Sequence, residues 1–185
     1  MMSDLHRIQY ENDEAAFKRF YEAYVFKLFQ FAFAFVQDKG AAEEIVNDVF
    51  LKLWQQRGRL DSIENLNVYL YVAIKNTSGN YLRKQKSRLR MDLESVTVSH
   101  FFLSPDPEQV MVTAELRKVI ERSINQLPPK CKLIFKLVKE DGLSMQEVGS
   151  ILNLSYKTVH AQLSIALKKL EVVLQPDLRG YLKRV

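Results

Sequence analysis

The sequence predicts an all-α protein of two small helical domains joined by a linker, with a helix-turn-helix in the second domain. Apolar side chains recur every three or four residues along most of the 185-residue chain, which is the period of an amphipathic helix. Residues 92–107 lose that period and mix serines, β-branched residues and two prolines, a composition that favours a linker. Residues 144–155 combine two helix caps with a tight turn, which predicts the helix-turn-helix.

Three helices are predicted in the first domain, residues 1–90. The first carries an aromatic stripe from Phe17 to Phe35, which we expect to pack in a core, and it breaks at the polar residues 37–40. A polar connection at 57–64 precedes the third helix, which starts near Asn65 and extends to about Arg83. The second helix covers residues 41–55, and its predicted buried stripe is Ala42, Ile45, Val46, Val49 and Leu53.

Four helices are predicted after the linker, which we place at residues 91–107. They cover residues 108–126, 130–140, 144–152 and 156–174. Pro128 and Pro129 end the first of them, because proline lacks the amide hydrogen that a helix interior needs. The second domain is therefore residues 108–175, followed by a tail at 176–185.

The composition excludes several classes of protein. With 47% hydrophobic residues the chain is not intrinsically disordered as a whole, and its one cysteine, Cys131, excludes a disulfide scaffold and the multi-cysteine zinc sites. The N-terminal residues 1–7 lack the apolar core of a signal peptide and no apolar run approaches the length of a membrane span, so we expect a soluble cytoplasmic protein without direct membrane insertion. No P-loop, GxGxxG, GxSxG, HExxH or CxxC pattern occurs, and we expect no enzymatic activity, cofactor or metal site.

The formal net charge of +5 is unevenly distributed. Residues 67–91 hold six basic and no acidic side chains, and residues 128–185 hold ten basic and five acidic ones. The remaining segments, 1–66 and 92–127, are each net acidic. Two separate positive blocks indicate two separate contacts with a polyanion.

The helix-turn-helix follows from local chemistry at residues 143–160. Ser144 and Glu147 have the spacing of a capping box, Gly149 offers a small side chain where two helices cross, and Asn153 tolerates the left-handed turn. Leu154 is expected to fill the core and Ser155 to cap the second helix. The inward face of that helix is predicted to be Val159, Leu163, Ala166, Leu167 and Leu170.

The second helix of such a motif enters the DNA major groove by its N-terminal end. Residues 156–170 contain three lysines and no acidic residue, as contact with phosphates requires. The alternative is a helix pair that binds no DNA. The candidate DNA-binding residues are Tyr156, Lys157, Thr158, His160, Ala161, Ser164 and Lys168.

The third helix of the first domain combines aromatic and basic side chains, which suits unstacked, single-stranded bases. Its buried stripe is predicted to be Leu66, Leu70, Ala73, Ile74, Thr77 and Tyr81. The candidate nucleic-acid residues on its other faces are Asn67, Tyr71, Lys75, Ser78 and Arg83. The alternative is a solvated basic helix whose tyrosines simply pack.

The second helix has an unusual outer face, because Leu51 lies there among polar residues. One exposed leucine is ordinary on a protein surface, but within this face it is equally compatible with a protein-binding site. The candidate face comprises Asn47, Asp48, Leu51, Lys52 and Gln55.

Four segments in this order resemble bacterial RNA polymerase sigma factors of the extracytoplasmic-function (ECF) group, most of all its Bacteroidetes branch. They are residues 42–54, residues 65–76, residues 127–132 and the helix-turn-helix, within a resemblance that spans about residues 12–172. The sequence departs from the family pattern at Asn47, Lys75, Asn80 and Asn153, where Gln, Arg, Asp and Gly are usual.

The resemblance implies a promoter-specificity subunit with no catalytic site. The face with Leu51 would dock on the clamp helices of the largest subunit of core RNA polymerase. The connection at 57–64, with Asn67, Tyr71, Lys75 and Ser78, would capture flipped bases of the minus-ten promoter element. The helix-turn-helix would read the minus-thirty-five element in duplex DNA, the linker would thread through polymerase channels, and an anti-sigma factor would be a further partner. The rival hypothesis is a conventional transcription regulator whose residues 1–90 form a dimerisation or sensor module.

Overall fold

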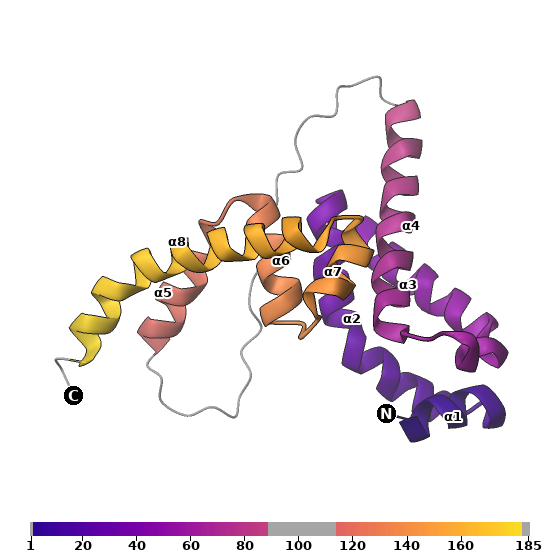
Figure 1. Ribbon diagram of the computed structural model, residues 1–185. Helices are drawn as coiled ribbons and strands as arrows, with labels where there is room; N and C mark the ends of the chain where they lie inside the picture. Colours follow the sequence, from indigo (N-terminus) through magenta and orange to yellow (C-terminus); the bar gives the residue numbers. More distant parts are fainter. Residues whose placement is uncertain (1, 89–113, 183–185) are drawn as a thin grey trace. The chain divides into compact units, whose positions relative to one another are not determined.

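A computed structural model describes residues 2–88 and 114–182, which are entirely helical apart from short connections and fall into two compact units (Figure 1). The all-α prediction is therefore confirmed. The predicted linker at 91–107 lies outside the described residues.

The first unit is built around α2, a helix of 23 residues that spans Glu14–Val36 and packs against both α3 (Lys39–Gln55) and α4 (Leu66–Arg88). Helix α1 (Met2–Glu11) lies against α2 and against η1, a 3-10 segment at Arg57–Ser62 (Figure 1). The aromatic stripe of α2 supplies much of the core, as predicted: Phe20, Tyr24, Leu28 and Phe31 are buried.

Side-chain caps define where these helices begin. The Asp13 carboxylate accepts a hydrogen bond from the amide of Ala16 at 2.9 Å and thereby caps α2. Asp38 caps α3 in the same way through the amide of Ala41, at 2.8 Å. The predicted break at residues 37–40 is shorter in the structure: only Gln37 and Asp38 separate the two helices, because α3 begins at Lys39, two residues earlier than expected.

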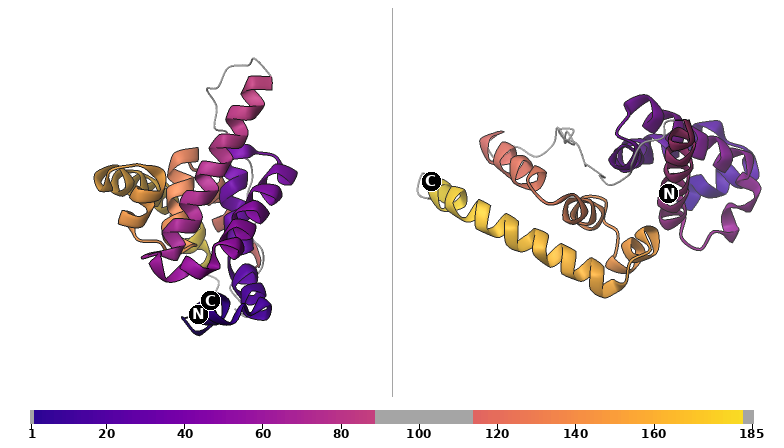
Figure 2. Two further views of the ribbon diagram at one scale, coloured as in Figure 1. Left: turned by 90° about the vertical axis from the view of Figure 1, so that its right-hand side faces the viewer. Right: turned by 90° about the horizontal axis from the view of Figure 1, so that it is seen from above.

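The second unit contains α5 (Ala114–Asn125), α6 (Pro129–Lys139), α7 (Met145–Leu152) and α8 (Tyr156–Leu182). Helices α5, α6 and α7 each pack against α8, and the views in Figure 2 show α8 as the long helix along which the others lie. Its core includes Ile124, Leu127, Cys131, Ala166 and Leu170. Cys131 is buried, and its thiol contacts Oε1 of Gln162 at 3.0 Å.

Two expectations about helix extent need correction. Helix α1 was not predicted at all, and α8 continues to Leu182, through most of the segment predicted to be a tail. The predicted inward position of Leu167 is also wrong, because this side chain is 43% exposed while Ala166 and Leu170 are buried.

Candidate nucleic-acid interface

The helix-turn-helix has the geometry that its sequence predicts. The hydroxyl of Ser144 accepts from the amide of Glu147 at 3.2 Å, and the Glu147 carboxylate accepts from the amide of Ser144 at 2.7 Å, so both halves of the capping box are formed. Asn153 ends α7 with φ 57° and ψ 47°, in the left-handed region. The hydroxyl of Ser155 then accepts from the amide of Thr158 at 3.1 Å and caps α8.

Gly149 allows the two helices of the motif to approach closely. A Cβ atom at this position would lie 2.8 Å from the carbonyl oxygen of Leu154, within the turn. Val148, Ile151 and Val159 are fully buried around this crossing. The N-terminal end of α8 is therefore fixed relative to α7 by backbone and core contacts.

The first turns of α8 present most of the predicted reading residues to solvent. Tyr156 is 49% exposed and its ring stacks on that of His160, with centroids 6.3 Å apart. Thr158 and Ser164 are half-buried, and the Thr158 hydroxyl lies 2.8 Å from that of Ser155, within the cap. The exposed members of the predicted set are Tyr156, Lys157, His160, Ala161 and Lys168.

The predicted nucleic-acid face of α4 is partly wrong. Tyr71 is 1% exposed and its ring packs edge-on against Phe31, at a centroid distance of 4.9 Å. Ser78 is completely buried two turns further on. Both side chains belong to the core stripe with Leu70 and Ile74, because α4 turns this edge, and not the Thr77 and Tyr81 edge, toward α2.

The other candidates on α4 are accessible. Asn67 is exposed at the first turn, and its side-chain oxygen accepts a hydrogen bond from the hydroxyl of Tyr24 at 2.5 Å. Burial raises the pKa of the Tyr24 phenol, which favours the neutral hydroxyl that donates to Asn67. Lys75 is half-buried, and Arg83 is exposed with its guanidinium bonded to Asn80 on the same helix.

The outer face of α3 matches its prediction. The five predicted buried residues are all buried, and Leu51 is 55% exposed. The side-chain oxygen of Asn47 accepts a hydrogen bond from the hydroxyl of Tyr21 at 3.0 Å, which orients this amide from α2. The residues exposed together on this face are Asn47, Asp48, Leu51, Lys52 and Gln55.

Sequence reasoning missed the contacts between α1 and the connection that follows α3. Gln9 and Tyr10 of α1 bond to η1, and Arg57 of η1 bonds back to Asn12 at 2.6 Å. The Arg57 guanidinium also lies over the ring of Trp54, 4.3 Å from its centroid. The repeated amphipathic spacing used to find helices carries no signal for such polar, long-range contacts.

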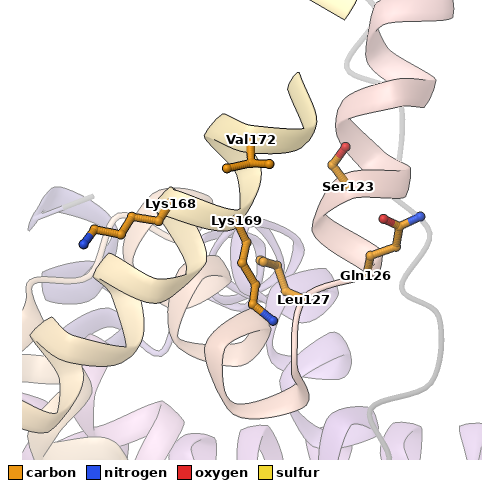
Figure 3. Close-up of a pocket in the computed structure, with 6 residues that line it drawn as sticks. All are labelled: Ser123, Gln126, Leu127, Lys168, Lys169 and Val172. Atoms are coloured by element: carbon orange, nitrogen blue, oxygen red, sulfur yellow. The ribbon is translucent and has the colours of Figure 1, made fainter. Parts of the chain in front are cut away.

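A cavity of about 370 Å³ lies in the second unit between the end of α5 and α8 (Figure 3). Lys169 extends toward Leu127 in this cavity, whereas the side chain of Lys168 points away from α5 (Figure 3). The six lining residues are Ser123, Gln126, Leu127, Lys168, Lys169 and Val172.

The described residues show neither a metal-binding cluster nor a membrane-spanning helix. No group of three or more His, Cys, Asp or Glu side chains within 2–88 and 114–182 could hold a metal ion. In the same part of the chain, no helix has both the length and the apolar character needed to cross a lipid bilayer.

Comparison with known proteins identifies both units. Residues 20–88 match the family model of Sigma-70 region 2 and residues 117–170 match that of Sigma-70, region 4, which together cover about two thirds of the chain. The ECF RNA polymerase sigma-E factor of Escherichia coli (strain K12) is 25% identical over 182 residues, which cover 95% of this chain and 94% of that protein. The ECF RNA polymerase sigma factor SigW of Bacillus subtilis (strain 168) is 25% identical over 160 residues, or 83% and 86% of the two chains.

A solved structure shares the fold. The sigma factor RpoE in complex with the anti-sigma factor NepR, from Bartonella quintana, superimposes with a TM-score of 0.56 and 20% identity, over 86% of this chain and 96% of that chain. Two sigma-70 regions in the family's order, each on its own helical unit, show that the chain belongs to the sigma-70 family, as an ECF sigma factor that directs promoter recognition in transcription initiation.

Proposed function

We propose that three surfaces of this sigma factor make different contacts during transcription initiation. The N-terminal end of α8 reads the minus-thirty-five element in duplex DNA, the start of α4 with the preceding connection holds the melted minus-ten element, and the outer face of α3 docks on the clamp helices of core RNA polymerase. The observation that carries the proposal is that the basic surface and the protein-binding candidate lie on different helices. Residues 67–91 have six cations and no carboxylate, whereas α3 exposes Leu51 within a mixed polar face.

The minus-thirty-five surface would use Lys157 and Lys168 for phosphates and the stacked pair Tyr156 and His160 for groove contacts. The absence of acidic residues between 156 and 170 supports this assignment, because a carboxylate there would repel the phosphate backbone. Ala161 is small enough to let the helix approach base edges. Thr158 and Ser164 border this surface as half-buried hydroxyls.

The minus-ten surface would use Asn67, Lys75 and Arg83 together with residues 57–64. Exposed cations on α4 favour the phosphates of an unpaired strand. Captured bases then contribute hydrogen bonds and stacking that offset the lost base pairs, so binding itself drives melting. Tyr71 and Ser78 are excluded from this surface by their burial.

Several further features complete the proposal. The protein acts in the cytoplasm without catalytic activity of its own, with domains at 1–90 and 108–175, a linker at 91–107 and C-terminal residues 176–185, most of which continue α8. An anti-sigma factor is a partner, and this is supported by the solved structure of related fold from Bartonella quintana, which is a complex of a sigma factor with an anti-sigma factor. The amino-acid sequence of residues 42–54 and the short linker support membership of the Bacteroidetes branch of the ECF group.

Run-off transcription with purified core polymerase on genomic DNA tests the proposal. We expect promoter-specific transcripts only when the full chain is present. The rival assignment, a conventional regulator, predicts DNA binding without core polymerase and no co-purification with it. The absence of any promoter-specific transcript would contradict the proposed function.

A further inference from the structure

Gln9, on the helix that sequence periodicity does not predict, holds the connection between α3 and α4. Its side-chain nitrogen Nε2 donates to the carbonyl oxygen of Gly58 at 3.3 Å. Its oxygen Oε1 accepts from the backbone amide of Asp61 at 3.0 Å. One side chain therefore binds a backbone acceptor and a backbone donor, three residues apart in η1.

The two bonded groups lie on opposite sides of a kink. Arg59 has φ −120° and ψ 16°, which is outside the helical region, so η1 is two short turns joined at this residue. A kink leaves backbone groups without regular helical partners, and such groups need others. Among neutral side chains, a carboxamide offers both a donor and an acceptor in one rigid plane, which suits it to this place.

Neighbouring contacts hold both α1 and η1 in place around Gln9. Ile8 is 1% exposed and fixes α1 on the domain, while the hydroxyl of Tyr10 donates to Asp61 at 3.2 Å. On the side of η1, Arg57 bonds to Asn12 and to the carbonyl oxygen of Trp54, at 2.6 and 2.8 Å. Helix α1 is thus a fixed support and η1 is the part that it shapes.

We infer that Gln9 is a positioning residue for the melted minus-ten strand, because it pre-shapes the connection that captures unpaired bases. The inference rests on the proposed role of residues 57–64. Gln9 itself contacts only the backbone of Gly58 and Asp61, so it acts by reducing the number of conformations that this connection must lose when a base binds.

The size of the effect follows from the two hydrogen bonds. Both hydrogen bonds are neutral and exposed, so we expect their removal to cause a roughly threefold to tenfold loss of affinity for the minus-ten strand. The Gln9→Met variant removes both bonds while keeping the length and helix propensity of the side chain. The matched control is Glu11→Gln on the same helix, which disturbs only the exposed pair with Arg7.

The experiment uses holoenzyme assembled from the full chain and core polymerase. The probes are single-stranded oligonucleotides with the minus-ten sequence of a promoter found by run-off transcription, and the same strand with its minus-ten bases substituted. The measurement is the ratio of the two affinities, which reports base capture, alongside affinity for core polymerase and the unfolding midpoint. We expect Gln9→Met to lower the ratio threefold to tenfold, with unchanged core affinity, while Glu11→Gln behaves as wild type.

Each other outcome overturns the inference in a recognisable way. A wild-type holoenzyme that does not discriminate the two strands removes the proposed function, and the inference with it. A wild type that discriminates and a Gln9→Met variant with the same ratio refute the positioning role alone. A Gln9→Met variant that loses affinity for core polymerase and for the strand in equal measure would show that Gln9 contributes to the general stability of the protein and does not position the connection.

Discussion

The backbone of Leu154 leaves no room for a side chain on Gly149, since a Cβ there would lie 2.8 Å from the Leu154 carbonyl oxygen. We therefore expect Gly149→Ala to force α7 away from the turn and to cost about 1–3 kcal/mol, as overpacking does. Amide hydrogen exchange of α7 and α8 should show the loss, and minus-thirty-five binding should weaken with it.

The matched control for this change is Gly79→Ala, in the interior of α4. A Cβ at Gly79 has no atom within 4 Å, so alanine should raise stability by about 0.5–1 kcal/mol through backbone entropy. Trp54, the one tryptophan of the chain, lies in the same unit as α4. Its fluorescence should therefore report the change in unfolding caused by Gly79→Ala but not that caused by Gly149→Ala. Equal effects of the two alanines would contradict the steric account.

Leu51 and Trp54 lie one turn apart on α3 and should respond differently to substitution. Leu51 is 55% exposed, so Leu51→Asp should weaken affinity for core polymerase and leave the unfolding midpoint unchanged. Trp54 packs on Phe17 at a centroid distance of 4.8 Å, and Trp54→Ala should destabilise the unit by about 2–3 kcal/mol, below the cost at fully buried sites.

Circular dichroism measures the stability of both α3 variants, and a binding titration with core polymerase measures their affinity. Phe26→Asp is the control, because Phe26 is 50% exposed on α2 and lies outside the α3 face. Unchanged polymerase affinity for Leu51→Asp would refute the docking assignment.

Tyr71 distinguishes a core residue from a nucleic-acid contact. Its burial against Phe31 predicts that Tyr71→Ala costs about 3–5 kcal/mol, measured by urea unfolding with Trp54 fluorescence. Lys75→Ala on the same helix should change the stability little but weaken binding of the minus-ten strand. A Tyr71→Ala protein of normal stability would show that the ring is not part of the core.

Lys157 should contribute charge to minus-thirty-five binding in a measurable way. If it neutralises one phosphate, Lys157→Gln lowers affinity for all duplex sequences and reduces the slope of log K against log salt by about 1. Holoenzyme binding to promoter DNA at several salt concentrations gives this slope. Lys139→Gln, at an exposed position in α6, should leave it unchanged, and an equal change in both variants would argue against a specific contact.

Features set by local chemistry could be predicted from the sequence, residue by residue. Ser144 and Glu147 cap each other across three residues, and Asn153 adopts the left-handed conformation within its own turn, so neither depends on distant parts of the chain. The buried stripe of α3 was also predictable, because its alternation of apolar and charged residues leaves a single apolar face.

Features set by packing against another helix could not be predicted. The pattern of α4 offers two adjacent stripes. Its packing against α2, where Tyr71 meets Phe31, and against α3 leaves Tyr71 buried and Thr77 half-exposed. Helix α1 buries Ile8 deeply but holds η1 through polar bonds to residues about fifty positions away, which helical periodicity does not register.

Tyr21 and Tyr24, separated by three positions on α2, donate hydrogen bonds to Asn47 on α3 and to Asn67 on α4. The same turn of α2 thus orients one amide on the proposed polymerase surface and one on the proposed DNA surface. In a genetic screen, phenylalanine alleles at these two tyrosines, which remove only the hydroxyls, should therefore separate into two phenotypic classes. Tyr21 alleles should group with recruitment defects and Tyr24 alleles with melting defects, although both map to a helix that forms neither surface.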